Sequence, residues 1–123
     1  MKVLVVEDDP SVRETLGMVL EAYQHEPNLV KDGEQALDYL QTSWPDAMLL
    51  DLTLPGMTGE EVYERIQQRF GRVPPTVVLS AAQQGASRTR HLSGARFLAK
   101  PYTLEQLADI LVETVNSARE GAA

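Results

Sequence analysis

The chain has 123 residues, of which 43% are hydrophobic, so its length suits one domain with a core of its own. Eighteen acidic residues against eleven basic ones give a net charge of −7, which argues against a surface for nucleic acid or anionic membranes. Cysteine is absent, and no apolar run approaches the roughly 20 residues of a membrane helix. We therefore expect one cytoplasmic domain over residues 1–123 that binds neither nucleic acid nor membrane.

Short apolar runs alternate with amphipathic stretches, which is typical of a parallel sheet covered by helices on both faces. The runs that predict buried strands are Val3–Val6, Ala47–Leu50, Val77–Leu79 and Phe97–Ala99, and a weaker run, Asn28–Val30, predicts an edge strand. Apolar residues at helical spacing predict helices over 12–23, 62–70 and 104–118, and a shorter one after Asp32 and Gly33. The final helix is expected to end near Arg119. This alternation predicts a doubly wound α/β fold.

Three helix starts carry capping signals. Asp9 directly before Pro10 fits an N-cap followed by a first-turn proline. The stretches Thr58–Glu61 and Thr103–Gln106 both fit capping boxes. We therefore interpret Asp9 as a cap and not as a further metal ligand in the acidic run to which it belongs.

Polar side chains directly follow four of the predicted strands. They are Glu7 and Asp8 after the first strand, Asp51 after the third, Ser80 after the fourth and Lys100 after the fifth. Open α/β sheets bind ligands at the carboxyl ends of their strands, where the strand order reverses. If the order is 2-1-3-4-5, the three carboxylates meet in one pocket. Such a cluster of oxygen ligands requires a cation and favours Mg2+.

The same residue types support phosphoryl transfer. A carboxylate such as that of Asp51 can attack phosphorus and form an aspartyl phosphate when cations neutralise the charge on the transferring oxygens. Lys100 is the matching cation, and the Ser80 hydroxyl can donate a hydrogen bond to a phosphoryl oxygen. The pattern offers no strong general acid for a difficult leaving group.

These motifs together resemble the receiver domain of bacterial two-component response regulators, and the resemblance covers essentially the whole chain. The segments that carry it are Val3–Asp9, Leu49–Gly59, Leu79–Ala81 and Phe97–Pro101. The resemblance implies a flavodoxin-like receiver fold with a five-stranded parallel sheet in the order 2-1-3-4-5. It also implies a signalling phosphoacceptor that is not an enzyme in the usual sense, although it supports its own phosphorylation and a slow autodephosphorylation.

By the same resemblance, Asp51 is the phosphoacceptor and Lys100 pairs with the phosphate. Glu7, Asp8, Asp51 and the carbonyl of Thr53 form the Mg2+ site. Ser80 and Phe97 form the switch pair, and a cis bond precedes Pro101. The implied phosphodonor is a phosphohistidine on a sensor histidine kinase or a histidine phosphotransfer protein. The fourth helix, fifth strand and fifth helix would offer an output or homodimer face.

Three alternatives stay open from the sequence. A phosphatase of the haloacid dehalogenase type also uses an aspartate after a strand, but it typically has a second acid where this chain has Thr53. A degenerate receiver would serve only as a binding module, although the polar residues at the strand ends are all present. A flavodoxin relative is the weakest, because the loop after the first strand is acidic and lacks its Ser, Thr and Gly.

The segment 82–94 departs from the family pattern. The stretch from Ser80 to Lys100 is slightly shorter than in most receiver domains, and Gln83–Ser87 offers no large apolar anchor. We expect a shortened or displaced fourth helix that is the least stable element, which phosphorylation or a partner could order.

Overall fold

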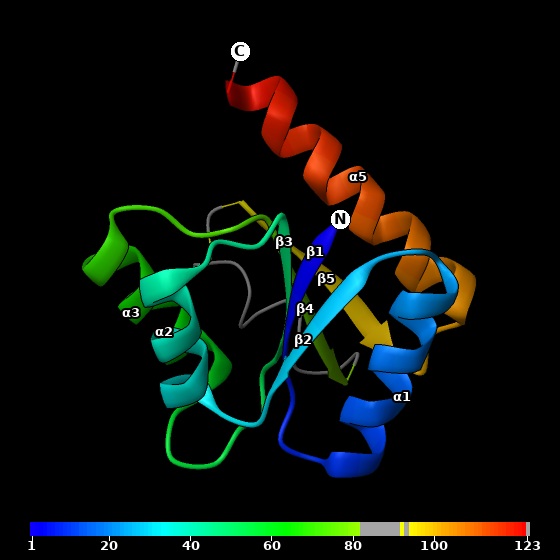
Figure 1. Cartoon of the computed structure of the whole chain (residues 1–123), viewed down its shortest axis with the longest axis horizontal. Helices are drawn as coiled ribbons and strands as arrows, with labels where there is room; N and C mark the ends of the chain where they lie inside the picture. Colours follow the sequence, from blue (N-terminus) through cyan, green and yellow to red (C-terminus); the bar gives the residue numbers. More distant parts are fainter. Residues whose placement is uncertain (82–91, 93, 123) are drawn as a thin grey trace.

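The computed structural model describes residues 1–81, 92 and 94–122. Its strands are β1 (Lys2–Val6), β2 (Glu26–Val30), β3 (Ala47–Asp51), β4 (Thr76–Ala81) and β5 (Ala95–Lys100). Its helices are α1 (Pro10–Ala22), α2 (Gly33–Thr42), α3 (Gly59–Phe70) and α5 (Leu104–Ala122), as labelled in Figure 1. The shortened fourth helix expected over 82–94 lies outside the described residues, apart from positions 92 and 94.

The strands form one five-stranded sheet in the order β2-β1-β3-β4-β5, and every neighbouring pair is parallel. This arrangement confirms the predicted doubly wound α/β fold. Val6 at the end of β1 is level with Leu50 in β3, and Asp51 is level with Leu79 in β4. The carboxyl ends of the central strands therefore meet at one edge of the sheet.

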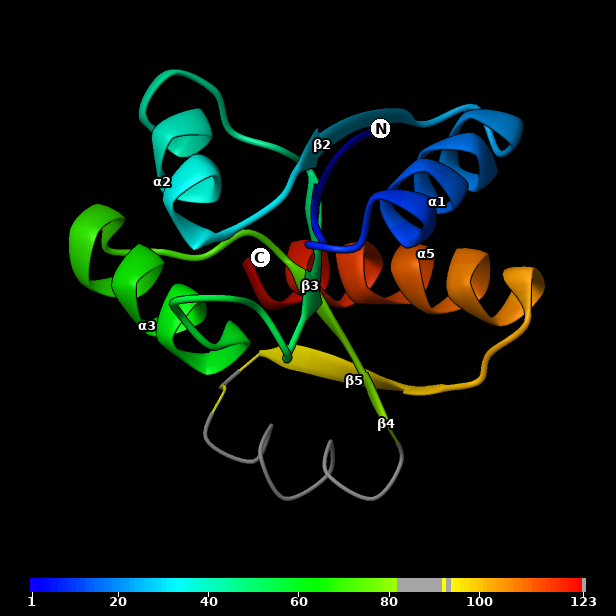
Figure 2. The ribbon, with the colours of Figure 1, turned by 90° about the horizontal axis from the view of Figure 1, so that it is seen from below.

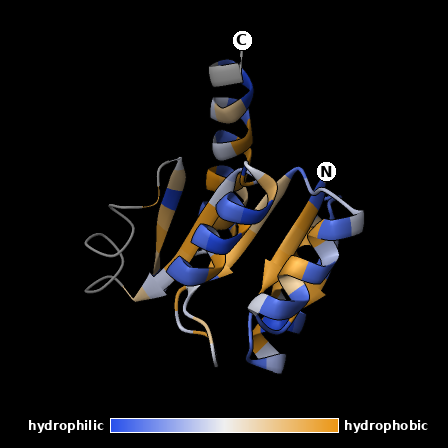
Figure 3. Ribbon diagram, turned by 90° about the vertical axis from the view of Figure 1, so that its left-hand side faces the viewer, coloured by the Kyte–Doolittle hydropathy of each residue, from blue (hydrophilic) through white to orange (hydrophobic). Residues whose placement is uncertain are grey.

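Helices cover both faces of the sheet: α1 and α5 pack on one face, and α2 and α3 on the other (Figures 1 and 2). The cluster beneath α1 and α5 contains Val3, Val5, Leu16, Leu20, Leu49, Leu107 and Leu111. The cluster beneath α2 and α3 contains Leu4, Val6, Leu37, Leu50, Val62 and Ile66. Alternate strand residues thus enter opposite clusters, which explains why the central strands are mostly apolar (Figure 3). In the part of the chain that the structure describes, no helix is long and apolar enough to cross a membrane.

The predicted caps are confirmed at three helices. The Asp9 carboxylate accepts hydrogen bonds from two backbone N–H groups of the first turn of α1, at 2.9 and 3.3 Å. The Thr58 hydroxyl accepts from the N–H of Glu61 at 3.2 Å and caps α3. Before α5, Gln106 donates its N–H to the Thr103 hydroxyl at 3.0 Å, and the Thr103 N–H donates to the Gln106 side chain at 2.8 Å. These bonds satisfy donors that a helix start leaves free and fix the loops that precede the helices.

The observed bounds of β2, β5 and α5 extend beyond the runs that predicted them. β2 begins at Glu26 and β5 at Ala95, because edge strands pair on one side only and tolerate polar residues that interrupt an apolar run. Arg96 is one such residue, and its guanidinium reaches α5, where it contacts Glu113 and Ser117 at 3.4 and 2.6 Å. α5 continues to Ala122, since a single glycine lowers helix stability by only about 1 kcal/mol.

An aromatic group lies just before β3, at the end of the sheet opposite the acidic residues. Trp44, the only tryptophan, meets Phe70 at the end of α3 edge to face, with ring centroids 5.8 Å apart. The guanidinium of Arg72 stacks over the Trp44 ring at 4.0 Å. Both rings are half-buried against the cluster beneath α2 and α3, so this group seals that end of the core.

Candidate functional site

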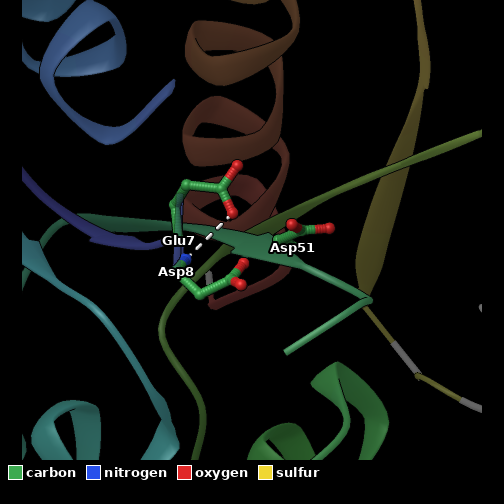
Figure 4. A group of neighbouring side chains, drawn as sticks. All are labelled: Glu7, Asp8 and Asp51. Carbon is green, nitrogen blue, oxygen red and sulfur yellow. Dashed lines mark hydrogen bonds between the residues drawn. The ribbon is translucent and has the colours of Figure 1, made fainter. Parts of the chain in front are cut away.

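Three carboxylates meet where β1 and β3 end. Glu7 and Asp8 follow β1 directly, and Asp51 is the last residue of the neighbouring strand β3. One carboxylate oxygen from each residue lies within 4.8 Å of the others. Figure 4 shows the three side chains gathered where the two strands end. The predicted convergence of these side chains is therefore confirmed, because the shared register places the two strand ends side by side.

Glu7 is the most unusual member of this cluster because its side chain is buried, with only 3% of the residue exposed. Its Oε2 accepts a hydrogen bond from the backbone N–H of Asp8 at 3.0 Å (Figure 4). Burial, together with the neighbouring Asp51 carboxylate, raises the pKa of Glu7 from 4.5 to about 8, although Lys100 opposes the shift. Without a cation, burial and the neighbouring carboxylate therefore favour the protonated form of the Glu7 carboxyl group.

Asp51 is held between a lysine and a backbone amide. The Nζ atom of Lys100, at the end of β5, lies 3.8 Å from Asp51 Oδ1. The same oxygen accepts a hydrogen bond from the N–H of Thr53 at 3.2 Å. Asp51 is only 7% exposed, so its carboxylate is presented from a mostly buried position. The peptide bond between Lys100 and Pro101 is cis, as the resemblance implied.

Comparison with known proteins decides the family. Residues 3–112 match the response regulator receiver domain. The chain belongs to this family. Response regulator MprA of Mycobacterium avium is 36% identical over 109 residues, which are 87% of this chain and 47% of that protein. This receiver domain therefore spans about half the length of the curated relatives it matches.

Solved receiver domains share the fold. The receiver domain of sensor histidine kinase PA1611 from Pseudomonas aeruginosa, with a magnesium ion coordinated in its active site cleft, has a TM-score of 0.81 and 29% identity. A putative response regulator from Chloroflexus aurantiacus has a TM-score of 0.83 and 30% identity. Each comparison covers 94% of this chain and 97% of the other. The likeness thus extends over the whole sheet and not only over the motifs.

Ser80 lies on β4, which is next to β3, and Phe97 lies on the edge strand β5. Ser80 is buried near the end of β4, and its hydroxyl donates to the carbonyl of Ala81 at 3.4 Å. Phe97 is half-buried in β5 and level with Val78 of β4. Both residues therefore occupy the elements that the sequence predicted, and their role as a switch stays a prediction.

The acidic cluster fits a hard divalent cation in this receiver domain. Its donors are the carboxylates of Glu7, Asp8 and Asp51, which together offer oxygen ligands only. Such ligands suit Mg2+, which binds a few carboxylates and keeps several waters. Asp9 is not part of the cluster, because its carboxylate caps α1. The structure thus brings together the predicted acids and separates the one that was predicted to be a cap.

The sequence analysis did not single out Arg13, although it contacts this loop. Its Nη1 donates to the carbonyl oxygens of Glu7 and Asp8, at 2.9 and 3.2 Å. The only sequence signal was a basic residue one turn into the helix that follows the acids, and such residues are usually solvated. Only the fold of the loop shows that this side chain turns back toward the site.

Proposed function

We propose that Asp51 accepts a phosphoryl group from a phosphohistidine on a sensor histidine kinase or a histidine phosphotransfer protein. The phosphorylated domain would then signal through altered contacts with other proteins. The observation that carries this proposal is the placement of Lys100 Nζ 3.8 Å from Asp51 Oδ1, beside two further carboxylates. Membership of a family that functions in two-component signalling supports it.

The chemistry follows from these groups. An Asp51 oxygen attacks phosphorus, the bond between phosphorus and the histidine nitrogen breaks, and its electron pair stays on the imidazole. Lys100 and the Thr53 N–H lie where they can compensate the negative charge that gathers on the transferred group. Water later attacks the acyl phosphate, which releases inorganic phosphate and restores the carboxylate.

In this proposal Mg2+ is held by Glu7, Asp8, Asp51 and the backbone carbonyl of Thr53. The cation would neutralise the clustered carboxylates and polarise the phosphoryl oxygens. Because burial favours the protonated form of Glu7, Mg2+ binding should lower the pKa of its carboxyl group and release a proton.

The remaining roles depend on phosphorylation. The Ser80 hydroxyl would donate a hydrogen bond to the phosphoryl group, and the ring of Phe97 would turn inward into the space that is freed. The fourth helix, β5 and α5 would form the output or homodimer face, of which most of the fourth helix lies outside the described residues. A phosphatase of the haloacid dehalogenase type is less well supported, because Thr53 stands where that family has its general acid.

The intact mass of the protein after incubation with acetyl phosphate and Mg2+ tests the proposal. We expect one added phosphoryl group on the wild type and none on Asp51→Asn. Asp9→Asn is the matched control, since it removes a neighbouring acid that only caps α1, and it should label like the wild type. Stoichiometric labelling of Asp51→Asn would disprove the assignment of Asp51.

A further inference from the structure

One arginine is bonded to the loop that carries two of the three acidic side chains. Arg13 Nη1 donates to the carbonyl oxygen of Glu7 at 2.9 Å and to that of Asp8 at 3.2 Å. Both carbonyls lie beyond Val6, the last residue of β1 that pairs with β2 and β3. The guanidinium therefore supplies partners for backbone groups that the sheet no longer holds.

The direction of this side chain follows from its place in α1. Helical side chains lean toward the N-terminus of their helix, so a residue one turn into α1 covers the loop that precedes it. The N–H of Arg13 donates to the carbonyl of Asp9 at 2.9 Å, which places it at that first turn. The capped start of α1 thus aims the half-buried Arg13 side chain back over Glu7 and Asp8.

The contacts of the loop are few and specific. The N–H of Glu7 donates to the carbonyl of Val30 at 3.1 Å, and the N–H of Asp8 donates to the Glu7 carboxylate at 3.0 Å. The two Arg13 bonds satisfy the carbonyls of the same two residues. Without the guanidinium, the peptide groups at these carbonyls can rotate toward water, and rotation displaces the carboxylates attached to the same backbone.

We propose, on the basis of the function proposed above, that Arg13 is a positioning residue for the divalent cation. It fixes the backbone of Glu7 and Asp8 so that both carboxylates already face Asp51 before a cation binds. Groups that orient metal ligands without touching the metal typically change metal affinity or activity by about 10–100-fold. Since Arg13 acts on the ligands and not on the attacking oxygen, its effect falls on the Mg2+ concentration required.

The test is a Mg2+ titration of the rate at which acetyl phosphate labels the wild type and Arg13→Met. Methionine keeps an unbranched stem but has no donor. We expect the half-saturating Mg2+ concentration to rise about tenfold in the variant. The labelling rate at saturating Mg2+ should stay within about twofold of the wild type, because Asp51 and Lys100 are untouched.

A matched control separates positioning from a loss of positive charge. Arg96→Met also removes an arginine with two side-chain partners, but those partners are Glu113 and Ser117 on α5. Its half-saturating Mg2+ concentration should match that of the wild type. Arg13→Lys keeps the charge without the planar fork and should fall between the wild type and Arg13→Met. A folded Arg13→Met with a wild-type Mg2+ dependence would overturn the proposal.

A second readout keeps this inference separate from the proposed function. The amide NMR shifts of Glu7 and Asp8, followed during a Mg2+ titration without phosphodonor, report binding alone. The half-saturating Mg2+ concentration obtained from them should rise about tenfold in Arg13→Met, as in the labelling assay. If the wild type binds Mg2+ but is not labelled, the phosphoacceptor proposal fails while the role of Arg13 is still tested. If Arg13→Met does not fold, Arg13→Gln takes its place, because its shorter side chain cannot bridge both carbonyls.

Discussion

Replacing Glu7 by glutamine should stabilise the metal-free protein at neutral and alkaline pH. The unfolded chain ionises this carboxyl group near 4.5, whereas the folded protein holds its pKa at about 8, chiefly through burial. Between these values the folded state binds a proton that the unfolded state has lost. Folding stability therefore falls as pH rises through this window, and the loss ends above about pH 8.

The size of the effect follows from the same two pKa values. Each pH unit inside the window costs up to about 1.4 kcal/mol, so ionisation of the unfolded chain lowers stability by roughly 3–4 kcal/mol at pH 7. Near pH 5 the loss is below about 1 kcal/mol. Glutamine cannot ionise, and its amide oxygen can still accept the bond from the Asp8 N–H. The advantage of Glu7→Gln should therefore grow with pH.

Urea unfolding followed by circular dichroism, in buffers with a chelator at about pH 5, 7 and 8, measures this difference. Glu64→Gln, which neutralises an exposed glutamate of α3, is the control and should follow the wild-type pH profile. Added Mg2+ should stabilise the wild type more than Glu7→Gln, because the ion binds the folded site and one ligand has been lost. Parallel pH profiles for the wild type and Glu7→Gln would refute the reasoning.

Three further substitutions test the fold around the site. Gly59→Ala should lower stability by about 1–3 kcal/mol and slow labelling, because its Cβ would lie 2.6 Å from the Asp51 carbonyl oxygen and 2.8 Å from Leu52 Cα. Unfolding and labelling measured on one sample would show whether both change together. Asp9→Ala should cost about 1 kcal/mol in urea unfolding and leave the labelling of Asp51 intact. Leu49→Ala should cost about 2–5 kcal/mol, measured by thermal unfolding, because this side chain is 1% exposed in the central strand.

The sequence could predict the fold because a strand buried on both faces must be apolar throughout. The run Ala47–Leu50 shows this directly, and the polar residue that follows it, Asp51, had to emerge at the edge of the sheet. The caps at Asp9 and Thr58 could also be predicted, since their hydrogen bonds join residues that are close in the sequence. Local periodicity and local hydrogen bonds were thus sufficient to predict most of the architecture.

The properties that the sequence could not predict depend on distant contacts. The raised pKa of Glu7 results from burial beneath elements that other segments supply. The bonds from Arg13 require the exact path of the loop after β1, which no spacing rule fixes. The start of β5 was missed because the charged Arg96 interrupts the apolar run. Its guanidinium is accommodated by Glu113 and Ser117 on α5, which the sequence does not place beside it. In each case the property depends on how the fold places a side chain against a different element or loop, and the spacing of residues in the sequence does not show this placement.

The aromatic group before β3 has a spectroscopic consequence. Trp44 is the only indole in the chain, and its ring is half-buried against Phe70 and Arg72. It precedes β3, whereas Asp51 ends that strand, so the length of the sheet separates the two. Its fluorescence should respond to loss of packing between α2 and α3 and be insensitive to cations or phosphate at the acidic cluster. The domain therefore carries an intrinsic optical probe of unfolding that does not report on the chemistry of the site.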